Sequence, residues 1–358
     1  MDKPVDDRAW VATRKGLIEL RRRAGAWGVE RASFVGEPVS MVLPPDARGR
    51  MFAALQLGHF GAKIQASDDA GASWREVAAP AYPAQPEAAP GPPWKLVMVW
   101  SLERTGRTLL AGTLPGGLFR SDDDGRSWRL EESLWNRPER PSWSGGGYDV
   151  PGIHSICPLP SGTVLVGVSC AGAWITRDDG VSWQQTAHGM RAEYMPPEQA
   201  FDPQIQDPHA IARCAAQPEV LWCQHHNGIF RSVDGGAHWG ELAAPLSAFG
   251  FAVAAHPLDA RTAWFVPAVK DQCRVPVDRA LAVQRTRDGG ASFETLRAGL
   301  PQRDCYDLVY RHGLAVDGAG VGMLMGSTTG GLWASDDGGE GWSALSVRLA
   351  PVYALRMG

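Results

Sequence analysis

The chain has 358 residues, a formal net charge of −4 and a sequence pI near 6.1. This mild acidity supplies no positive field for nucleic acid, and no apolar run approaches the ~20 residues of a membrane span, so we expect neither partner. The first residues lack a basic and apolar leader, and the six cysteines form no Cys-x-x-Cys pair, so we expect a soluble cytoplasmic protein without a disulfide framework.

One eight-residue pattern, Ser/Thr-x-Asp-x-Gly-x-x-Trp/Phe, recurs six times along the chain. Its copies occupy residues 67–74, 121–128, 176–183, 232–239, 286–293 and 335–342. Successive copies therefore start 54, 55, 56, 54 and 49 residues apart. A period of about 50 residues indicates repeated supersecondary units, as in propellers and solenoids. Because the repeat runs through the whole chain, we predict one domain in residues 9–358 after a tail of residues 1–8.

Short apolar runs bounded by Gly and Pro surround each copy and are typical of strands. In chain order, the first unit has strands in residues 9–13 and 16–20 and a third near Trp27. Later units begin with an inner strand, predicted in residues 95–99, 154–157, 209–212 and 306–309. Two further strands precede each copy, for example residues 108–113 and 117–120, and the aromatic residue of the copy opens a fourth. Each unit is thus predicted to be an antiparallel blade with strands A to D from the inside outwards.

The eight-residue pattern has the chemistry of a tight turn between strands C and D. Its Asp accepts backbone amide hydrogen bonds, and its Gly supplies the positive φ that the turn needs. The Ser or Thr hydroxyl bonds across the turn, and the aromatic ring packs beneath it. We therefore predict a structural role for the six aspartates Asp69, Asp123, Asp178, Asp234, Asp288 and Asp337.

These six copies resemble the Asp-box, or bacterial neuraminidase repeat (BNR), of sialidases, xyloglucanases, sortilin-type receptors and photosystem II assembly factors. The resemblance covers most of residues 9–358 and implies a β-propeller whose boxes lie opposite the active or binding face. It does not select a function, because the class contains enzymes and non-enzymes. The sialidase subgroup fits poorly: its Arg-Ile/Leu-Pro motif precedes the first box, whereas the only similar string here, Arg274-Val275-Pro276, comes late.

A seventh unit is predicted from an eroded copy near the start of the chain. Residues 16–20 followed by Trp27 match residues 117–121 followed by Trp128, with the same spacing from glycine to tryptophan. This unit has no room for an inner strand, and residues 351–356 supply one from the other end. We therefore expect an all-β, seven-bladed propeller, closed by pairing of the C-terminal strand with N-terminal strands, which removes open edges. Six blades is the alternative.

Loop length directs the search for a site to the face opposite the boxes. The D–A connections at 78–93, 130–152 and 185–208, and the B–C connection at 268–280, are long for a compact domain, and such loops are usually functional. Polar and aromatic residues that converge on a concave rim are typical of a binding site. The predicted binding residues on that face are Lys95, His154, His209, His226, Tyr306, Trp135, Trp143 and Tyr148.

Three functions agree with these residues. Glycoside hydrolysis needs two carboxyl groups that flank the scissile bond, with aromatic rings stacking on the sugar. Its candidate catalytic residues are Asp207, Asp149 and Asp304, each just ahead of a predicted inner strand, and Asp207 is preferred because it precedes Pro208 and His209. A carbohydrate or another small molecule is the expected ligand. The alternative is a non-catalytic scaffold that binds a protein partner.

A metal-dependent site on the same face is the second alternative. Neutral imidazoles suit transition metals, and the candidate ligands are His59, His154, His209, His225 and His226. Because these side chains are expected to come from different blades, their spacing in the sequence does not establish a site. No cofactor is favoured.

Overall fold

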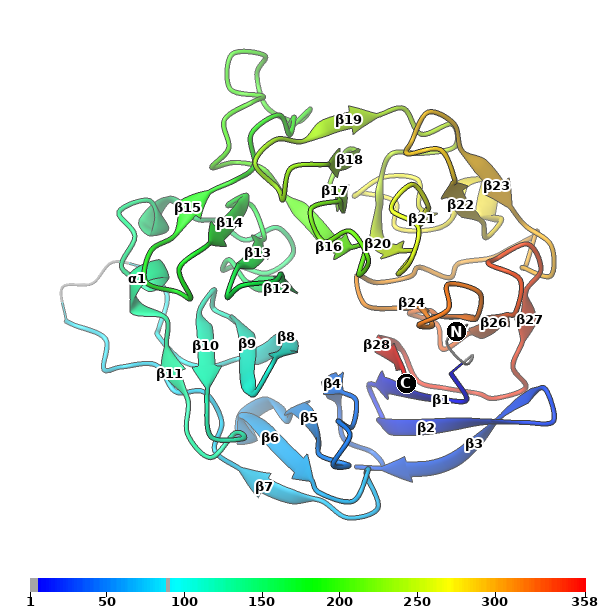
Figure 1. Cartoon of the computed structure of the whole chain (residues 1–358), viewed down its shortest axis with the longest axis horizontal. Helices are drawn as coiled ribbons and strands as arrows, with labels where there is room; N and C mark the ends of the chain where they lie inside the picture. The colour runs from blue at the N-terminus through cyan, green and yellow to red at the C-terminus, as the bar shows by residue number, and fades with distance from the viewer. Residues whose placement is uncertain (1–5, 88–90) are drawn as a thin grey trace.

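Branched and aromatic residues fill the strands of the repeated unit, and their side chains pack between neighbouring sheets. The computed structural model describes residues 6–87 and 91–358, which form seven four-stranded antiparallel sheets arranged in a ring (Figure 1). The predicted all-β class and the seven-bladed propeller are thereby confirmed. Residues 1–5 of the predicted tail and residues 88–90 of the predicted loop 78–93 lie outside the described residues.

Each blade runs from an inner strand near the axis to an outer strand, and we number the blades in chain order. Blade 1 contains β28 (Val352–Met357), β1 (Arg8–Thr13), β2 (Gly16–Arg23) and β3 (Ala26–Ser33); blade 2 contains β4 (Val39–Leu43), β5 (Met51–Gln56), β6 (Ala62–Ser67) and β7 (Arg75–Val77). Blade 3 contains β8 (Met98–Thr105), β9 (Thr108–Leu114), β10 (Leu118–Ser121) and β11 (Arg129–Leu130); blade 4 contains β12 (Ile153–Pro158), β13 (Val164–Val168), β14 (Ala173–Thr176) and β15 (Gln184–Gln185). Blade 5 contains β16 (Pro208–Arg213), β17 (Leu221–His225), β18 (Ile229–Ser232) and β19 (Gly240–Leu242); blade 6 contains β20 (Gly250–Ala255), β21 (Ala263–Pro267), β22 (Val283–Thr286) and β23 (Glu294–Leu296). Blade 7 contains β24 (Leu314–Val316), β25 (Met323–Gly326), β26 (Leu332–Ser335) and β27 (Ser343–Ala344).

Helices are confined to short turns in the connections between strands. They are α1 (Glu132–Trp135), η1 (Gly58–Phe60), η2 (Arg140–Ser142) and η3 (Val277–Arg279). No helix in the described part of the chain has the length and apolar character needed to cross a membrane.

The two ends of the chain meet in blade 1, as predicted. Strand β28 pairs antiparallel with β1, with Leu355 opposite Val11, so the C-terminal strand becomes the inner strand of the first blade (Figure 1). Leu355 is fully buried in a cluster with Val11 and Leu20 of blade 1 and Leu324 and Leu332 of blade 7. Burial of these side chains therefore stabilises ring closure as well as the backbone ladder.

The repeated eight-residue pattern forms the turn between the third and fourth strands of a blade. In the copy at 121–128, the Ser121 hydroxyl donates to Asp123 at 2.8 Å and accepts the N–H of Gly125 at 2.9 Å. Asp123 also accepts the N–H of Ser127 at 2.9 Å. Gly125 has a φ of 78°, the left-handed conformation in which glycine carries no steric penalty. The indole N–H of Trp128 donates to the carbonyl of Ala78 at 2.9 Å, which ties blade 3 to blade 2.

The predicted inner strand at residues 306–309 is wrong, because the inner strand of blade 7 is β24, at Leu314–Val316. The carboxylate of Asp307 instead accepts a hydrogen bond from Ser327 in the loop after β25, at 2.5 Å. A turn closed by the N–H of Gly313 and the carbonyl of Tyr310, at 2.8 Å, precedes the strand. The inner strand of blade 3 is also shifted, since β8 begins at Met98 and Lys95 precedes it. Only the ends of these segments are buried, at Met98 and Val99 and at Leu308 and Val309, whereas Lys95 and Tyr306 are exposed.

Candidate functional site

In each of blades 1 to 6, the pairing between the inner strand and its neighbour contains a register shift. Each shift interrupts the regular pairing with the neighbouring strand at one position of the inner strand. Such bulges commonly redirect a side chain next to a functional site. The residues at the shifts are Tyr353, Ser40, Trp100, His154, His209 and Phe251.

Rings at these positions contact one another from blade to blade. Trp100 and His154 meet edge to face with centroids 5.4 Å apart. His209 stacks on Phe251 at 4.4 Å with an interplanar angle of 10°. The bulged residues therefore form a partly aromatic girdle around the axis, although they lie more than 300 residues apart at the extremes of the chain.

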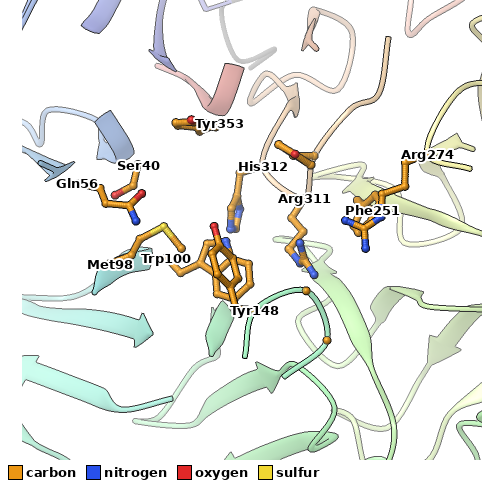
Figure 2. A pocket seen from close by; sticks show the side chains of 13 residues that line it. Ser40, Gln56, Met98, Trp100, Tyr148, Phe251, Arg274, Arg311, His312 and Tyr353 are labelled. Atoms are coloured by element: carbon orange, nitrogen blue, oxygen red, sulfur yellow. The ribbon is translucent and has the colours of Figure 1, made fainter. Parts of the chain in front are cut away.

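A cavity of about 240 Å³ opens inside this girdle. Figure 2 shows the side chains of Trp100, Tyr148, Phe251 and Arg311 around it. Tyr148 belongs to the long loop at 130–152 and Arg274 to the loop at 268–280, so both loops border the opening. The lining also contains Ser40, Gln56, Met98, Gly146, Gly147, Tyr310, His312 and Tyr353. None of these lining residues is Asp or Glu, so the charged groups of the cavity are the two guanidinium groups.

Arg311 lies between two aromatic rings at this cavity. Its guanidinium carbon is 4.9 Å from the ring centroid of Trp100 and 5.1 Å from that of Phe251. Its buried Nε has no hydrogen-bond partner among the described residues. Burial lowers the pKa of Arg311 to about 10, so the group remains charged at neutral pH. Arg274, by contrast, is neutralised by Asp271 at 2.5 Å.

Of the predicted binding residues, Tyr148 lines the cavity, and its ring meets Trp100 edge to face at 5.1 Å. Trp135 and Trp143 are only 5% and 7% exposed, so their rings have no free face for a ligand. They anchor the loop instead, as Trp143 does against Trp174 with centroids 5.5 Å apart. Lys95 and Tyr306 are exposed and do not line the cavity.

The three predicted carboxylates lie in different environments. Asp207 is 1% exposed. Asp149 is exposed on its loop, and Asp304 forms an ion pair with Arg279 at 3.5 Å while its own side chain is 77% exposed. None of the three lines the cavity at the axis.

Asp207 instead forms a compact group with two histidines, all from blade 5. Asp207 precedes β16, His209 is its second residue and His226 follows β17. The Oδ2 of Asp207 is 3.3 Å from Nε2 of His209 and 3.3 Å from Nδ1 of His226. The backbone holds this arrangement, because the N–H of His226 donates to the carbonyl of Asp207 at 2.9 Å. Burial lowers the pKa of His209, and the neighbouring carboxylate of Asp207 opposes this shift.

The other histidines predicted as ligands do not join this group. His225 accepts the backbone N–H of Asp207 on its Nε2 at 2.9 Å, and burial lowers its pKa to about 3. His154 is fully buried, with Nδ1 3.3 Å from the Ser155 hydroxyl, and burial lowers its pKa well below the usual range. His59 is exposed on η1. The expectation that the ligands come from different blades is corrected, since the grouped residues share one blade.

Sequence reasoning missed several residues of the cavity. Trp100, Phe251 and Tyr353 lie at bulges, and a bulge leaves no mark in apolar alternation. Arg311 and His312 lie in the loop before β24. The sequence predicted an inner strand at residues 306–309, so these two residues were expected to follow that strand.

Comparison with known proteins supports the fold. No protein-family model and no curated protein sequence matches this chain. Among solved structures, the GH74 xyloglucanase Xcc1752 from Xanthomonas campestris matches with a TM-score of 0.62 at 17% identity, over 95% of this chain and 52% of that one. YCF48 from Cyanidioschyzon merolae matches with a TM-score of 0.53 at 14% identity, over 92% of this chain and 89% of that one. A Bacteroides fragilis protein named as a 6-phosphogluconolactonase gives a TM-score of 0.58 at 12% identity, over 98% and 97%.

These neighbours are propellers, and their identities are low enough that the likeness concerns the fold alone. This chain spans about half the length of the xyloglucanase it resembles. Because these neighbours carry names of different functions, they do not indicate one function for this chain.

Proposed function

We propose that this chain is an Asp-box propeller whose axial cavity binds a small anionic molecule, with an acidic sugar as the expected class, and does not cleave it. The observation that carries the proposal is the guanidinium of Arg311, which borders the cavity without a carboxylate among the lining residues. The six copies of the turn pattern and the hydrogen bonds within them support the Asp-box assignment.

A guanidinium group in this setting favours an anion. Its planar fork matches a carboxylate or phosphate in a bidentate manner, and the flanking rings of Trp100 and Phe251 keep water from its faces. The charge of Asp207 acts on Arg311 without a direct ion pair, and the buried Nε has no hydrogen-bond partner among the described residues. An incoming anion can supply that partner.

The size and lining of the cavity favour a ligand with a ring. A volume of about 240 Å³ lies below the ~300–1,000 Å³ typical of drug-sized ligands, so the cavity suits one small unit. Tyr148 is 46% exposed and offers a ring face at the rim. Aromatic rings with polar edges suit a sugar, which has one apolar face and a hydroxyl-rich periphery.

Binding is favoured over cleavage because the carboxyl groups are in the wrong places. Glycoside hydrolysis uses two carboxyl groups about 5–9.5 Å apart across the bond. No lining residue is a carboxylate, Asp207 is buried with two histidines, and Asp149 and Asp304 lie outside the cavity.

Calorimetric titration with glucuronate, glucose and inorganic phosphate tests the proposal. We expect glucuronate to bind, glucose to bind more weakly and phosphate to compete with glucuronate. Arg311→Met should weaken glucuronate binding by about 10- to 150-fold, since a hydrogen bond to a charged group contributes about 1.5–3 kcal/mol. Arg48→Met is the matched control, because that guanidinium is 60% exposed at a turn next to Asp46 and does not line the cavity.

Equal affinity for glucuronate and glucose, or an unchanged affinity in Arg311→Met, refutes the anion site. Release of aglycone from an aryl glucuronide, with loss of release in Asp207→Ala and Asp149→Ala, would support the hydrolase alternative instead.

A further inference from the structure

We propose that Asp207, His209 and His226 form a binding site for one divalent transition-metal ion of the zinc type. The ligand atoms are Oδ2 of the carboxylate, Nε2 of His209 and Nδ1 of His226, which all lie within 4.8 Å of one another. This site is separate from the proposed anion site, since none of its three residues lines the axial cavity.

The two oxygen–nitrogen separations fit a shared ion better than direct hydrogen bonds. Zinc bonds to imidazole nitrogen and carboxylate oxygen of about 2.1 Å place two tetrahedral ligands about 3.4 Å apart. Both measured oxygen–nitrogen separations are 3.3 Å. Charge-assisted N–H···O bonds are shorter, about 2.7–2.9 Å. Among the described residues, the buried Nδ1 of His226 has no hydrogen-bond partner.

The hydrogen bond from His209 to a carbonyl identifies which ring nitrogen is left for an ion. Its Nδ1 is 2.6 Å from the carbonyl oxygen of Gly250, and a carbonyl only accepts, so Nδ1 donates. The other ring nitrogen, Nε2, faces the carboxylate oxygen of Asp207 at 3.3 Å and is the atom that can bind an ion.

The surroundings are those of a metal ligand set. A metal-bound imidazole commonly donates its second N–H to a carbonyl, which fixes the ring, and the bond from His209 to Gly250 has this form. Phe251 stacks on His209 at 4.4 Å, and Phe249 meets His226 at 5.6 Å, so an apolar shell surrounds the group. Asp207 also accepts the N–H of Cys170 on Oδ1 at 3.4 Å, which leaves Oδ2 for the ion.

The site lies close to the surface of the protein. His226 borders a groove with Tyr194, Phe249 and Lys270, and its side chain is 22% exposed, whereas those of Asp207 and His209 are 1% exposed. The group therefore lies just beneath the surface at His226. Three protein ligands leave a tetrahedral ion one open position, which water or an incoming ligand fills. The charge of Arg311 acts against a cation here, and the carboxylate of Asp207 offsets it.

Zinc titration of the full chain, purified without a histidine tag and treated with a chelator, tests the proposal. We expect one equivalent of Zn²⁺ by calorimetry and by elemental analysis. Asp207→Asn and His226→Gln should each weaken zinc binding about 100-fold or more, because each removes a ligand. His59→Gln is the matched control, since it removes an exposed imidazole and should leave the affinity unchanged.

X-ray absorption at the zinc edge of the wild-type protein gives a readout that does not depend on the folding of any variant. We expect nitrogen and oxygen neighbours with scattering from two imidazole rings and no sulfur. Less than a tenth of an equivalent bound to the wild type would overturn the proposal, as would unchanged affinity in both ligand variants or a sulfur-containing shell. If the wild-type protein binds zinc but not glucuronate, the anion site is refuted and the metal site is not.

Discussion

Leu355 tests whether the C-terminal strand holds the ring closed. Its side chain is 0% exposed and packs with Val11 and Leu20 of the first blade and with Leu324 and Leu332 of the last. We consider the substitution Leu355→Ala, which leaves the backbone pairing of β28 with β1 in place and removes only the packing.

The expected loss follows from the burial of this side chain. A fully buried Leu→Ala change costs about 2.7–5 kcal/mol, the sum of the lost transfer free energy and the cavity that remains. We take about 3 kcal/mol, because β28 lies at the junction of two blades and can relax partly. The unfolding entropy of a chain of this length is about 0.75 kcal/mol per kelvin, so the thermal midpoint should fall by about 4 °C.

Thermal and urea denaturation followed by circular dichroism measure this loss. Leu258→Ala is the matched control, because Leu258 is 51% exposed in the turn after β20, and it should change stability by less than about 0.5 kcal/mol. A midpoint for Leu355→Ala within 1 °C of the control would refute the conclusion that packing of β28 stabilises closure (~4 °C being the shift expected).

Three further predictions concern contacts between blades and within the turns. Arg285→Met should cost about 2–3 kcal/mol in urea denaturation, because this 2% exposed guanidinium bonds Glu294 and Glu340 across two blades, while Arg287→Met at a 54% exposed position should cost far less. Gly112→Ala should cost about 1–3 kcal/mol, since an added Cβ would lie 2.4 Å from the carbonyl oxygen of Ile153 in the next blade; Gly147→Ala, where a Cβ meets nothing within 4 Å, should be near neutral, and equal losses would contradict the packing argument. Asp123→Asn should be destabilising above pH 4, because hydrogen bonds from Ser127 lower the pKa of Asp123 to about 2 and so stabilise the charged form. That difference from wild type should shrink as the pH falls from about 4, near the unfolded-state pKa, to about 2, where the folded-state carboxylate is half protonated. A difference that stays constant over this range in thermal scans would refute the assignment.

The site could be predicted only in part from the sequence, and particular residues explain why. Asp207, His209 and His226 were all singled out, because Asp-Pro-His and paired histidines at strand ends are visible in the sequence. Their grouping was not, because it depends on the pairing of β16 with β17. Arg311 was not predicted at all, since nothing local separates a loop arginine at the axis from one at the surface.

The sequence by itself determined the repeated blade, the number of blades and the closure of the ring. These depend on a turn motif and on apolar strands that recur at a fixed spacing, and local hydrogen bonding and burial set both. Only the tertiary structure decided which side chains face the axis. A bulge shifts one residue against its partner strand, and the resulting direction depends on pairing between segments that the sequence does not place side by side. The turn aspartates could be assigned from the sequence because their hydrogen-bond partners lie within four residues. The Asp207 group and the cavity around Arg311 could not, because closure of the ring brings their residues together.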